Sequence, residues 1–237
     1  MLTSVQKNRP PKTEAELLER CHSIAGLSFA QLGLGLELLI PAYPNQRKGW
    51  VGQAIELALG TDAQNKSVPD FQALGIELKT LPLNNSGTPT ESTFITSIPL
   101  LTIHKQQWKS SQCYAKLKRI LWVPVEGDKD IPYSQRRIGQ GFLWSPDDAE
   151  ERILAEDWNY LSFQISSGNI ETVDAKSGEY LQVRPKAAHG KSLCYGYDVY
   201  GNKIKTLPRG FYLRSRFTAK ILSFSMDLIR EKGINSK

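Results

Sequence analysis

Three charged side chains in the run Val68–Leu81 have the types and spacing that phosphodiester chemistry uses. Apolar and polar residues alternate toward its end, as in a strand with one apolar and one polar face, so Glu77 and Lys79 point the same way. Asp70 lies on the preceding extended segment, and residues 72–75 are few enough to form a hairpin connection that brings its carboxylate beside Glu77. Two carboxylates and an ammonium are therefore expected to converge on one side of a sheet.

This set of groups is what a metal-dependent phosphodiesterase needs. Two carboxylates, with phosphate oxygens and water, can hold Mg²⁺, which keeps several waters in proteins. A lysine beside them can orient or deprotonate the attacking water and offset charge on the phosphate. The alternative is a hairpin with a solvated, salt-bridged face, because an Asp followed by Glu-x-Lys arises by chance about once in a chain of this length. The rest of the chain has to decide between these interpretations.

Length and composition exclude several classes of protein. With 237 residues and 40% apolar content, the chain can bury a full core and fits one large domain or two lobes. No run approaches the roughly 18 apolar residues of a membrane span, and residues 1–11 lack the apolar core of a secretory signal. Three widely spaced cysteines argue against a disulfide framework or a structural zinc site, so we expect a reducing cytoplasm.

Basic residues gather in one block of the chain. Between Arg184 and Lys220, nine Lys or Arg residues accompany a single acid, Asp198, a local balance of +8 in a chain of formal net charge +6. A polyanion such as nucleic acid is the partner that this block predicts.

Periodicity and turn signals predict helices and strands around the acidic run. The helix expected from Trp50 to Gly60 contains one acid, Glu56, which needs a cation or a metal-site partner if it is buried. Alternation from Tyr114 to Val125 predicts a strand with a basic stripe at one end. The other expected elements are a helix from a capping box at Thr13 to Gly26, a strand within 92–102 that contains Phe94, a short helix within 104–112, a strand within 136–144, a helix capped by Ser145 and running to about Ser166, short strands from 170, and a helix over 215–232.

A series of short blocks, spread from about Thr13 to Phe224, carries a family resemblance. The blocks are Lys48-Gly49-Trp50, Glu56, Asp70, Leu74–Thr80, Lys116–Arg119, Trp122–Gly127, Gln135–Arg137, Leu143–Pro146, Gly178–Gln182, Arg184–Ala188 and Leu207–Leu213. In this order they resemble the family of the DNA mismatch repair endonuclease MutH, which is related to type II restriction enzymes. So many blocks in one order are not a chance match.

The resemblance implies a Mg²⁺-dependent endonuclease that nicks the unmethylated strand at hemimethylated GATC sites and is activated by MutL after MutS finds a mismatch. In the family's pattern Asp70 and Glu77 hold the metal, and Lys79 is the catalytic lysine. Glu56 and Lys116 match positions that support the site. The positions that match the family's DNA-binding surface are Lys48, Phe94, Arg184, Pro185, Lys186 and Tyr212. Residues 189–203 and 225–237 receive no role from the resemblance.

The chemistry of the matched residues agrees with DNA recognition. Arg184 and Lys186 are the donor types that read guanine O6 and N7 in the major groove, where the adenine N6 amine is also displayed. A methyl group on that amine adds bulk that a close aromatic such as Tyr212 could detect, which fits the association of this position with methylation sensing. Without the family, Tyr212 is equally well a half-buried aromatic of a sheet.

The helix and strand pattern supports α/β or α+β, and the expected fold class is α/β. The resemblance implies a restriction-endonuclease-like mixed central sheet flanked by helices, with two lobes around a DNA-binding cleft. We expect a flexible tail over residues 1–12, a nuclease domain over 13–232 and a short tail over 233–237. Within the domain, the catalytic lobe is expected mainly in 13–115 and the DNA-recognition lobe mainly in 116–232.

Two other functions remain open beside the nicking endonuclease. A single Asp/Glu/Lys constellation predicts a monomer that cuts one strand per encounter, whereas a GATC-specific restriction endonuclease would need a dimer or a second catalytic half and would act without MutL. A DNA-binding module with merely structural acids is the third possibility. A module that only binds DNA would lose affinity by keeping acids beside phosphate. The presence of Asp70 and Glu77, together with Lys79, therefore argues against this third possibility.

Overall fold

The computed structural model describes residues 9–47, 49–61, 68–173, 176–186 and 193–234, with side chains up to residue 225. Unit 1 contains Met1–Thr90 and Arg119–Trp144, and unit 2 contains Glu91–Lys118 and Ser145–Lys237. The units therefore interleave along the chain, whereas the sequence analysis drew one boundary between residues 115 and 116. No helix in the described residues has the length and apolar character to cross a membrane.

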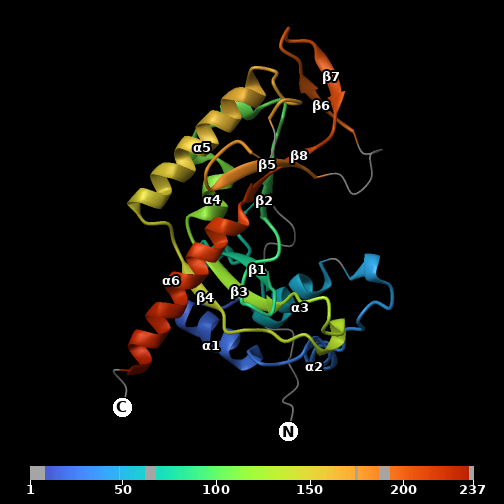
Figure 1. Cartoon of the computed structure of the whole chain (residues 1–237), viewed down its shortest axis with the longest axis vertical. Helices are drawn as coiled ribbons and strands as arrows, with labels where there is room; N and C mark the ends of the chain where they lie inside the picture. The colour runs from blue at the N-terminus through green and yellow to red at the C-terminus, as the bar shows by residue number, and fades with distance from the viewer. Residues whose placement is uncertain (1–8, 48, 62–67, 174–175, 187–192, 235–237) are drawn as a thin grey trace. The chain divides into compact units, whose positions relative to one another are not determined.

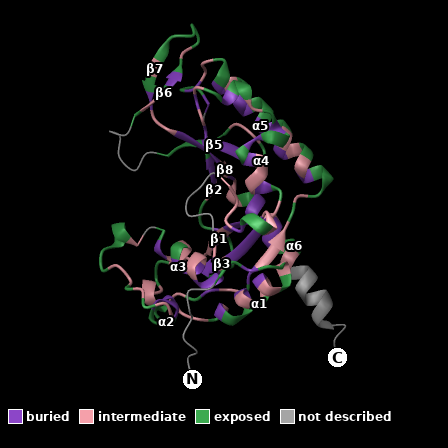
Figure 2. Cartoon of the chain, turned by 180° about the vertical axis from the view of Figure 1, so that it is seen from behind, coloured by how far each residue is buried: buried purple, intermediate pink, exposed green. Residues whose placement is uncertain are grey.

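Unit 1 is built on a three-stranded sheet in the order β1-β3-β4 (Figure 1). The strands are β1 (Glu77–Leu83), β3 (Ile120–Glu126) and β4 (Phe142–Trp144). β1 and β3 run parallel, with Glu77 beside Ile120 at one end and Leu83 beside Glu126 at the other, while β4 is antiparallel to β3. Most residues of β3 are buried, and those of β1 are buried or half-buried (Figure 2), as expected for strands covered on both faces.

Among the described residues, three helices supply most of the rest of the unit 1 core. They are α1 (Glu14–Ile24), α2 (Phe29–Gly35) and α3 (Trp50–Leu59). Their starts follow the sequence, because Thr13 Oγ1 accepts a hydrogen bond from Glu16 N at 3.1 Å and Ser28 forms a reciprocal capping box with Gln31. Buried residues of all three helices pack in one apolar cluster with residues of β1 and β3, which fixes the sheet from one side.

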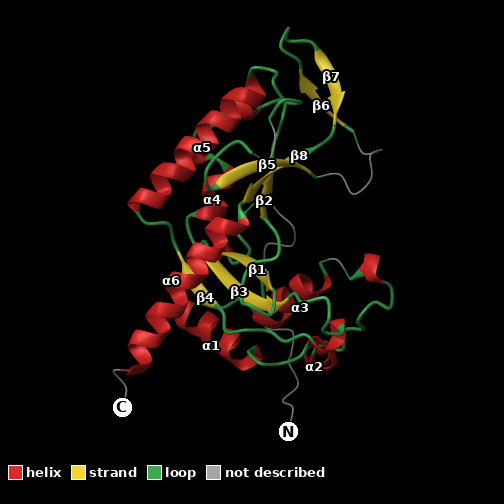
Figure 3. Ribbon diagram, viewed as in Figure 1, coloured by secondary structure: helices red, strands yellow, loops and turns green. Residues whose placement is uncertain are grey.

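The described residues of unit 2 form two further sheets and three helices. Figure 3 draws the strands in yellow and the helices in red. An antiparallel sheet in the order β2-β8-β5 is formed by β2 (Thr93–Ser97), β8 (Arg209–Leu213) and β5 (Leu181–Pro185), and β6 (Cys194–Tyr197) pairs with β7 (Lys203–Thr206) as a hairpin. The helices are α4 (Gln112–Leu117), α5 (Asp148–Ser166) and α6 (Ser215–Ile234). One face of the larger sheet is apolar: Phe211 is buried, and its ring centroid lies 6.5 Å from that of Trp158 of α5. The mixed α/β class expected from the sequence is confirmed.

Short 3-10 turns connect these elements. They are η1 (Pro44–Gln46), η2 (Gln72–Leu74), η3 (Ile103–Lys105), η4 (Trp108–Ser110) and η5 (Tyr133–Gln135). The short helix expected within 104–112 is thus two separate turns. The last helix continues through Gly233 to Ile234, two residues beyond the predicted end at Lys232.

The strand predicted from Tyr114 to Val125 is wrong in its first half. Ser111 Oγ accepts a hydrogen bond from Tyr114 N at 3.0 Å and starts α4, which ends at Leu117. The strand begins only at Ile120. Leucines four positions apart fit a helix as well as a strand, so the alternation did not reveal the helical cap. Lys116 consequently lies on a helix of unit 2 rather than on a strand.

The cap predicted for α5 is also wrong by two residues. Asp147, not Ser145, caps the helix: its Oδ1 accepts from Glu150 N at 2.8 Å, and Glu150 Oε2 accepts from Asp147 N at 3.4 Å. Ser145 Oγ instead donates to the Lys118 carbonyl oxygen at 2.8 Å. A carboxylate is the better cap here because it also neutralises the positive end of the helix dipole.

Candidate nuclease site and DNA-binding surface

The acidic run folds into the tight turn that its sequence predicts. Phe71 and Ile76 form an antiparallel bridge, and η2 between them ends at Gly75 with φ +65°. Asp70 Oδ2 accepts a hydrogen bond from Leu78 N at 2.9 Å. The side chain of Asp70 is thereby held alongside the first residues of β1.

Glu77 and Lys79 meet at the start of β1. The Glu77 side chain is 1% exposed, and Lys79 Nζ donates to its Oε1 at 2.6 Å. Burying a carboxylate is costly without a compensating charge, and Lys79 supplies that charge. Glu77 N also donates to Arg119 O at 3.0 Å, which fixes the backbone beside β3. The structure thus brings Asp70, Glu77 and Lys79 to one end of β1.

Asp70 and Glu77 are the carboxylates at this end of β1 that could hold a divalent cation. Among the described residues, no three His, Cys, Asp or Glu side chains form a group that could bind a metal by themselves. Two acids with water and phosphate oxygens nevertheless suit Mg²⁺, which is commonly held by one or two carboxylates plus substrate oxygens. The donor set therefore fits a cation that binds together with DNA.

The remaining residues expected at the catalytic site lie in different parts of the chain. Glu56 is half-buried on α3 of unit 1, a helix that contacts β1. Lys116 is half-buried on α4 of unit 2. Lys48, expected on the DNA-binding surface, lies outside the described residues.

The other residues expected to bind DNA gather on one face of the β2-β8-β5 sheet. Phe94 and Tyr212 are opposite each other in the register, and their rings meet edge to face with centroids 5.2 Å apart. The Arg184 guanidinium carbon lies 5.9 Å from the Tyr212 ring centroid, and Lys186 Nζ lies 4.3 Å from the Phe94 ring centroid. Pro185 ends β5, exposed, between these two cations. Two cations over two rings form a surface suited to an electron-rich, anionic ligand.

Hydrogen bonds fix the positions of the two cationic side chains, Arg184 and Lys186, on this surface. Lys186 Nζ donates to Ser97 Oγ at 2.8 Å, and Arg184 Nη1 donates to Ser92 Oγ at 3.4 Å. Burial raises the pKa of Tyr212 above its usual range, and the neighbouring Arg184 charge offsets part of that rise. The Tyr212 hydroxyl is therefore protonated at neutral pH and available as a donor.

Sequence analysis missed the buried acid that anchors β5. Asp157 of α5 accepts three backbone hydrogen bonds, from Glu179 N at 2.8 Å, Tyr180 N at 2.7 Å and Leu181 N at 2.8 Å. These bonds fix the segment that leads to Arg184. The sequence does carry a signal for this role. Asp157 lies at helical spacing within the apolar stripe of α5, where a charge is expected to have a structural partner.

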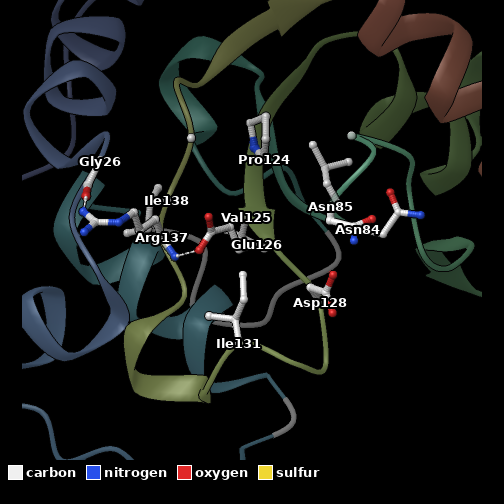
Figure 4. A pocket seen from close by; sticks show the side chains of 13 residues that line it. Gly26, Asn84, Asn85, Pro124, Val125, Glu126, Asp128, Ile131, Arg137 and Ile138 are labelled. Atoms are coloured by element: carbon white, nitrogen blue, oxygen red, sulfur yellow. Dashed lines mark hydrogen bonds between the residues drawn. The ribbon is translucent and has the colours of Figure 1, made fainter.

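A hollow of about 530 Å³ lies at the opposite end of β1 and β3 (Figure 4). Its lining includes Asn84, Glu126 and Arg137. Arg137 N donates to Glu126 Oε2 at 2.8 Å, and Arg137 Nη1 donates to Gly26 O at 2.8 Å. Asp70, Glu77 and Lys79 do not line it, so this hollow is separate from the acidic end of β1.

Comparison with known proteins decides the family. The model of the MutH family, described as DNA mismatch repair enzyme MutH, matches residues 59–157, a span that contains the acidic run. The DNA mismatch repair protein MutH of Vibrio campbellii (strain ATCC BAA-1116) is 48% identical over 212 residues, which cover 90% of this chain and 94% of that protein. The chain belongs to the MutH family. The MutH proteins of Histophilus somni (strain 2336) and Escherichia coli (strain SMS-3-5 / SECEC) are 47% and 44% identical over 219 and 214 residues, covering 92% and 90% of this chain and 98% and 93% of the relatives.

Membership of the MutH family settles several expectations at once. The fold is restriction-endonuclease-like, and the chain is an endodeoxyribonuclease of DNA mismatch repair. A MutH nuclease also suggests a divalent metal, in agreement with the two carboxylates beside β1.

Proposed function

We propose that this MutH-family protein is a Mg²⁺-dependent endonuclease that nicks the unmethylated strand of hemimethylated GATC sites in methyl-directed mismatch repair. MutL activates it, with MutS acting upstream, and the protein works as a cytoplasmic monomer. The observation that carries the catalytic part is the meeting of Asp70, Glu77 and Lys79 at one end of β1.

Each residue of this group has a role in the proposal. Bound by Asp70 and Glu77, Mg²⁺ would supply Lewis-acid polarisation of the scissile phosphate. Lys79, held beside Glu77 at 2.6 Å, orients the attacking water and offsets the charge that develops on phosphate. Glu56 and Lys116 support the site. Because Glu77 is buried in the sheet, its carboxylate is fixed before DNA arrives, as catalytic preorganisation requires.

The β2-β8-β5 face supplies the proposed sequence recognition. Arg184 and Lys186 are hydrogen-bond donors for guanine edges, and Pro185 restricts the backbone conformation between them. The edge-to-face pair of Phe94 and Tyr212 places an aromatic surface beside those cations, where a methyl group on adenine would be sensed by contact. Lys48 is proposed to contact DNA by its charge.

The test is cleavage of supercoiled plasmid carrying unmethylated, hemimethylated or fully methylated GATC sites, with Mg²⁺ or with EDTA. We expect Mg²⁺-dependent nicks confined to unmethylated strands, stimulated by MutL, MutS and a mismatch. Glu77→Gln should lower the nicking rate by roughly a hundredfold or more, because it removes a charged metal ligand while keeping the shape of the side chain. Glu19→Gln, at an exposed position of α1, is the matched control and should cut like wild type.

Each of the other functions predicts a different product. Hemimethylated DNA that is bound but never cut, even with MutL, MutS and a mismatch, would replace the catalytic proposal with a DNA-binding module. Linear product without a nicked intermediate, and without MutL, would favour a GATC-specific restriction endonuclease and would contradict the monomer.

A further inference from the structure

The β6–β7 hairpin presents an exposed face of tyrosine and lysine side chains. Tyr195 pairs with Lys205 and Tyr197 with Lys203, so these four side chains share one face. Tyr195 is 48% exposed and Tyr197 is 38% exposed, and both lysines are exposed. Lys203 Nζ lies 4.4 Å from the centroid of the Tyr195 ring. We call these four residues the hairpin face.

The opposite face of the hairpin is fixed to unit 2. Gly196 is buried, and a Cβ at this position would lie only 2.5 Å from Ile170 Cδ1, so any larger residue would displace the end of the Ile170 side chain. Thr206 is also buried, and its hydroxyl donates to Glu171 Oε1 at 2.5 Å. One side of the hairpin is therefore packed, which leaves the tyrosines and lysines directed outward.

The only acid between residues 193 and 206 is engaged in the turn. Asp198 Oδ1 accepts from Tyr200 N at 2.9 Å and from Asn202 N at 2.8 Å, and Oδ2 accepts from Asn202 Nδ2 at 3.1 Å. Burial acts to raise the pKa of Asp198, but the hydrogen bonds from Asn202 and Tyr200 outweigh it and hold the pKa below its usual range. The carboxylate thus shapes the tip, and the hairpin face itself carries positive charge.

The hairpin continues the proposed DNA-binding surface. It is inserted between β5, which carries Arg184, and β8, which carries Tyr212. Pro185 pairs with Arg209 at the end of the sheet, and just beyond them Lys186 N donates to Pro208 O at 2.7 Å. The hairpin follows the end of the sheet at which β5 ends and β8 begins (Figure 1). We call the face of this sheet that carries Phe94, Arg184 and Tyr212 the recognition face. A ligand on the recognition face that continues past this end of the sheet would extend toward the hairpin.

We propose that the hairpin face binds the phosphate backbone of duplex DNA outside the GATC bases and so lengthens the DNA footprint of the protein. The inference rests on the proposed function, because it takes the same DNA as its ligand. Lysine ammonium and tyrosine hydroxyl groups are donors that proteins use on phosphate oxygens, and such contacts add affinity without sequence information. A strand of four residues spans about 13 Å, or roughly four base pairs.

The composition of the hairpin face favours DNA over a protein partner. Protein interfaces are depleted of lysine at their centres, whereas here every tyrosine faces a lysine across the hairpin. The face also belongs to the block from Arg184 to Lys220, in which nine basic residues accompany one acid. Both features suit a polyanion.

The test compares two labelled hemimethylated GATC duplexes by fluorescence anisotropy, with Ca²⁺ replacing Mg²⁺. One duplex ends within about two base pairs of the site, and the other continues for roughly twelve on each side. The variant is Lys203→Ala/Lys205→Ala. We expect it to bind the long duplex roughly tenfold more weakly than wild type, with a slope of log K against log salt that is smaller by about 2. On the short duplex the two proteins should bind within about twofold of each other.

Two further variants sharpen the result. Tyr195→Phe/Tyr197→Phe removes only the hydroxyl groups and should weaken binding to the long duplex alone, with an unchanged salt slope. Lys12→Ala/Lys129→Ala removes the same charge from exposed positions of unit 1 and should match wild type on both duplexes. The proposal would be overturned if this control variant lost as much DNA affinity as the hairpin variant. It would also be overturned if the hairpin variant lost as much affinity for the short duplex as for the long one.

The outcomes separate this inference from the proposed function. Wild type that prefers and nicks GATC DNA, beside a hairpin variant that binds the long duplex normally, would overturn the hairpin proposal alone. A hairpin variant that binds both duplexes normally but loses stimulation by MutL would assign the face to a protein partner instead. Wild type that binds neither duplex would overturn both proposals.

Discussion

Gly210 is the residue that makes room for the aromatic pair on the recognition face. A Cβ at Gly210 would lie 2.8 Å from Phe94 Cε2 and 3.2 Å from Tyr212 Cε2. We therefore expect Gly210→Ala to displace these rings, to lower the free energy of unfolding by about 1–3 kcal/mol, and to reduce discrimination between methylated and unmethylated GATC duplexes. Urea denaturation and binding to the two duplexes measure these effects.

Gly52 provides the matched control at the residue scale. It lies within α3, and a Cβ there would meet no atom within 4 Å. Gly52→Ala should raise the free energy of unfolding by up to about 1 kcal/mol, because alanine has the higher helix propensity. If Gly210→Ala unfolds at the wild-type urea concentration and discriminates methylation as well as wild type, the space at this position does not set the ring geometry.

The meeting of Asp70, Glu77 and Lys79 was predictable from sequence because its contacts are local. Asp70 reaches a backbone amide eight residues away, and Glu77 and Lys79 are two residues apart on one strand face. The recognition face was reached only through the family resemblance. Phe94 and Tyr212 meet through strand register between distant segments, which no local pattern encodes.

At the scale of elements, the three backbone hydrogen bonds to Asp157 tie α5 to the start of β5. Asp157→Asn replaces one acceptor oxygen by a donor, which leaves at least one buried amide unsatisfied. We expect a loss of about 1–3 kcal/mol in the free energy of unfolding. Weaker binding of GATC duplexes should accompany it, because β5 carries Arg184. Thermal or urea unfolding together with anisotropy measures both effects.

Asp148→Asn is the control, an exposed acid in the first turn of the same helix. It should cost less than about 1 kcal/mol, through the helix dipole alone, and should leave DNA affinity unchanged. If Asp157→Asn is destabilised yet binds DNA with wild-type affinity, the Asp157 anchor supports the fold of unit 2 without positioning Arg184.

The type of an element was predictable where one sequence signal dominated. The prediction failed where two signals competed. The cap and the apolar spacing of α1 agree, so its position was predicted well. In the segment before β3, the helical cap at Ser111 competes with a strand-like alternation, and the cap determines the structure as far as Leu117. A capping hydrogen bond satisfies an otherwise unpaired amide, which periodicity alone does not represent.

At the scale of the whole molecule, the division into interleaved units could not be predicted from local sequence. Unit 1 takes Arg119–Trp144 from the middle of the chain because β3 pairs in parallel with β1 and β4 completes that sheet. A parallel pair requires a long crossover, and here the crossover contributes residues to unit 2. Unit membership is therefore set by pairing between distant strands.

Each unit buries one thiol, which gives the whole molecule a pH-dependent stability. Burial raises the pKa of Cys21 in unit 1 to about 12, and it also raises the pKa of Cys113 in unit 2. The folded state therefore keeps thiol protons that the unfolded chain releases above about pH 8.5. This stability is fully present below that pH and is lost as pH rises toward the folded pKa, by about 1.4 kcal/mol per thiol per pH unit.

We accordingly expect Cys21→Ala/Cys113→Ala to show a shallower fall in unfolding free energy between pH 8.5 and 10 than wild type, whatever its stability at neutral pH. The slope with pH is the quantity to compare, because removing buried side chains lowers stability at every pH. Urea denaturation at a series of pH values measures both proteins. Equal slopes for wild type and the double variant would mean that the two thiols ionise alike in the folded and unfolded chain, and that their burial does not withhold them from water.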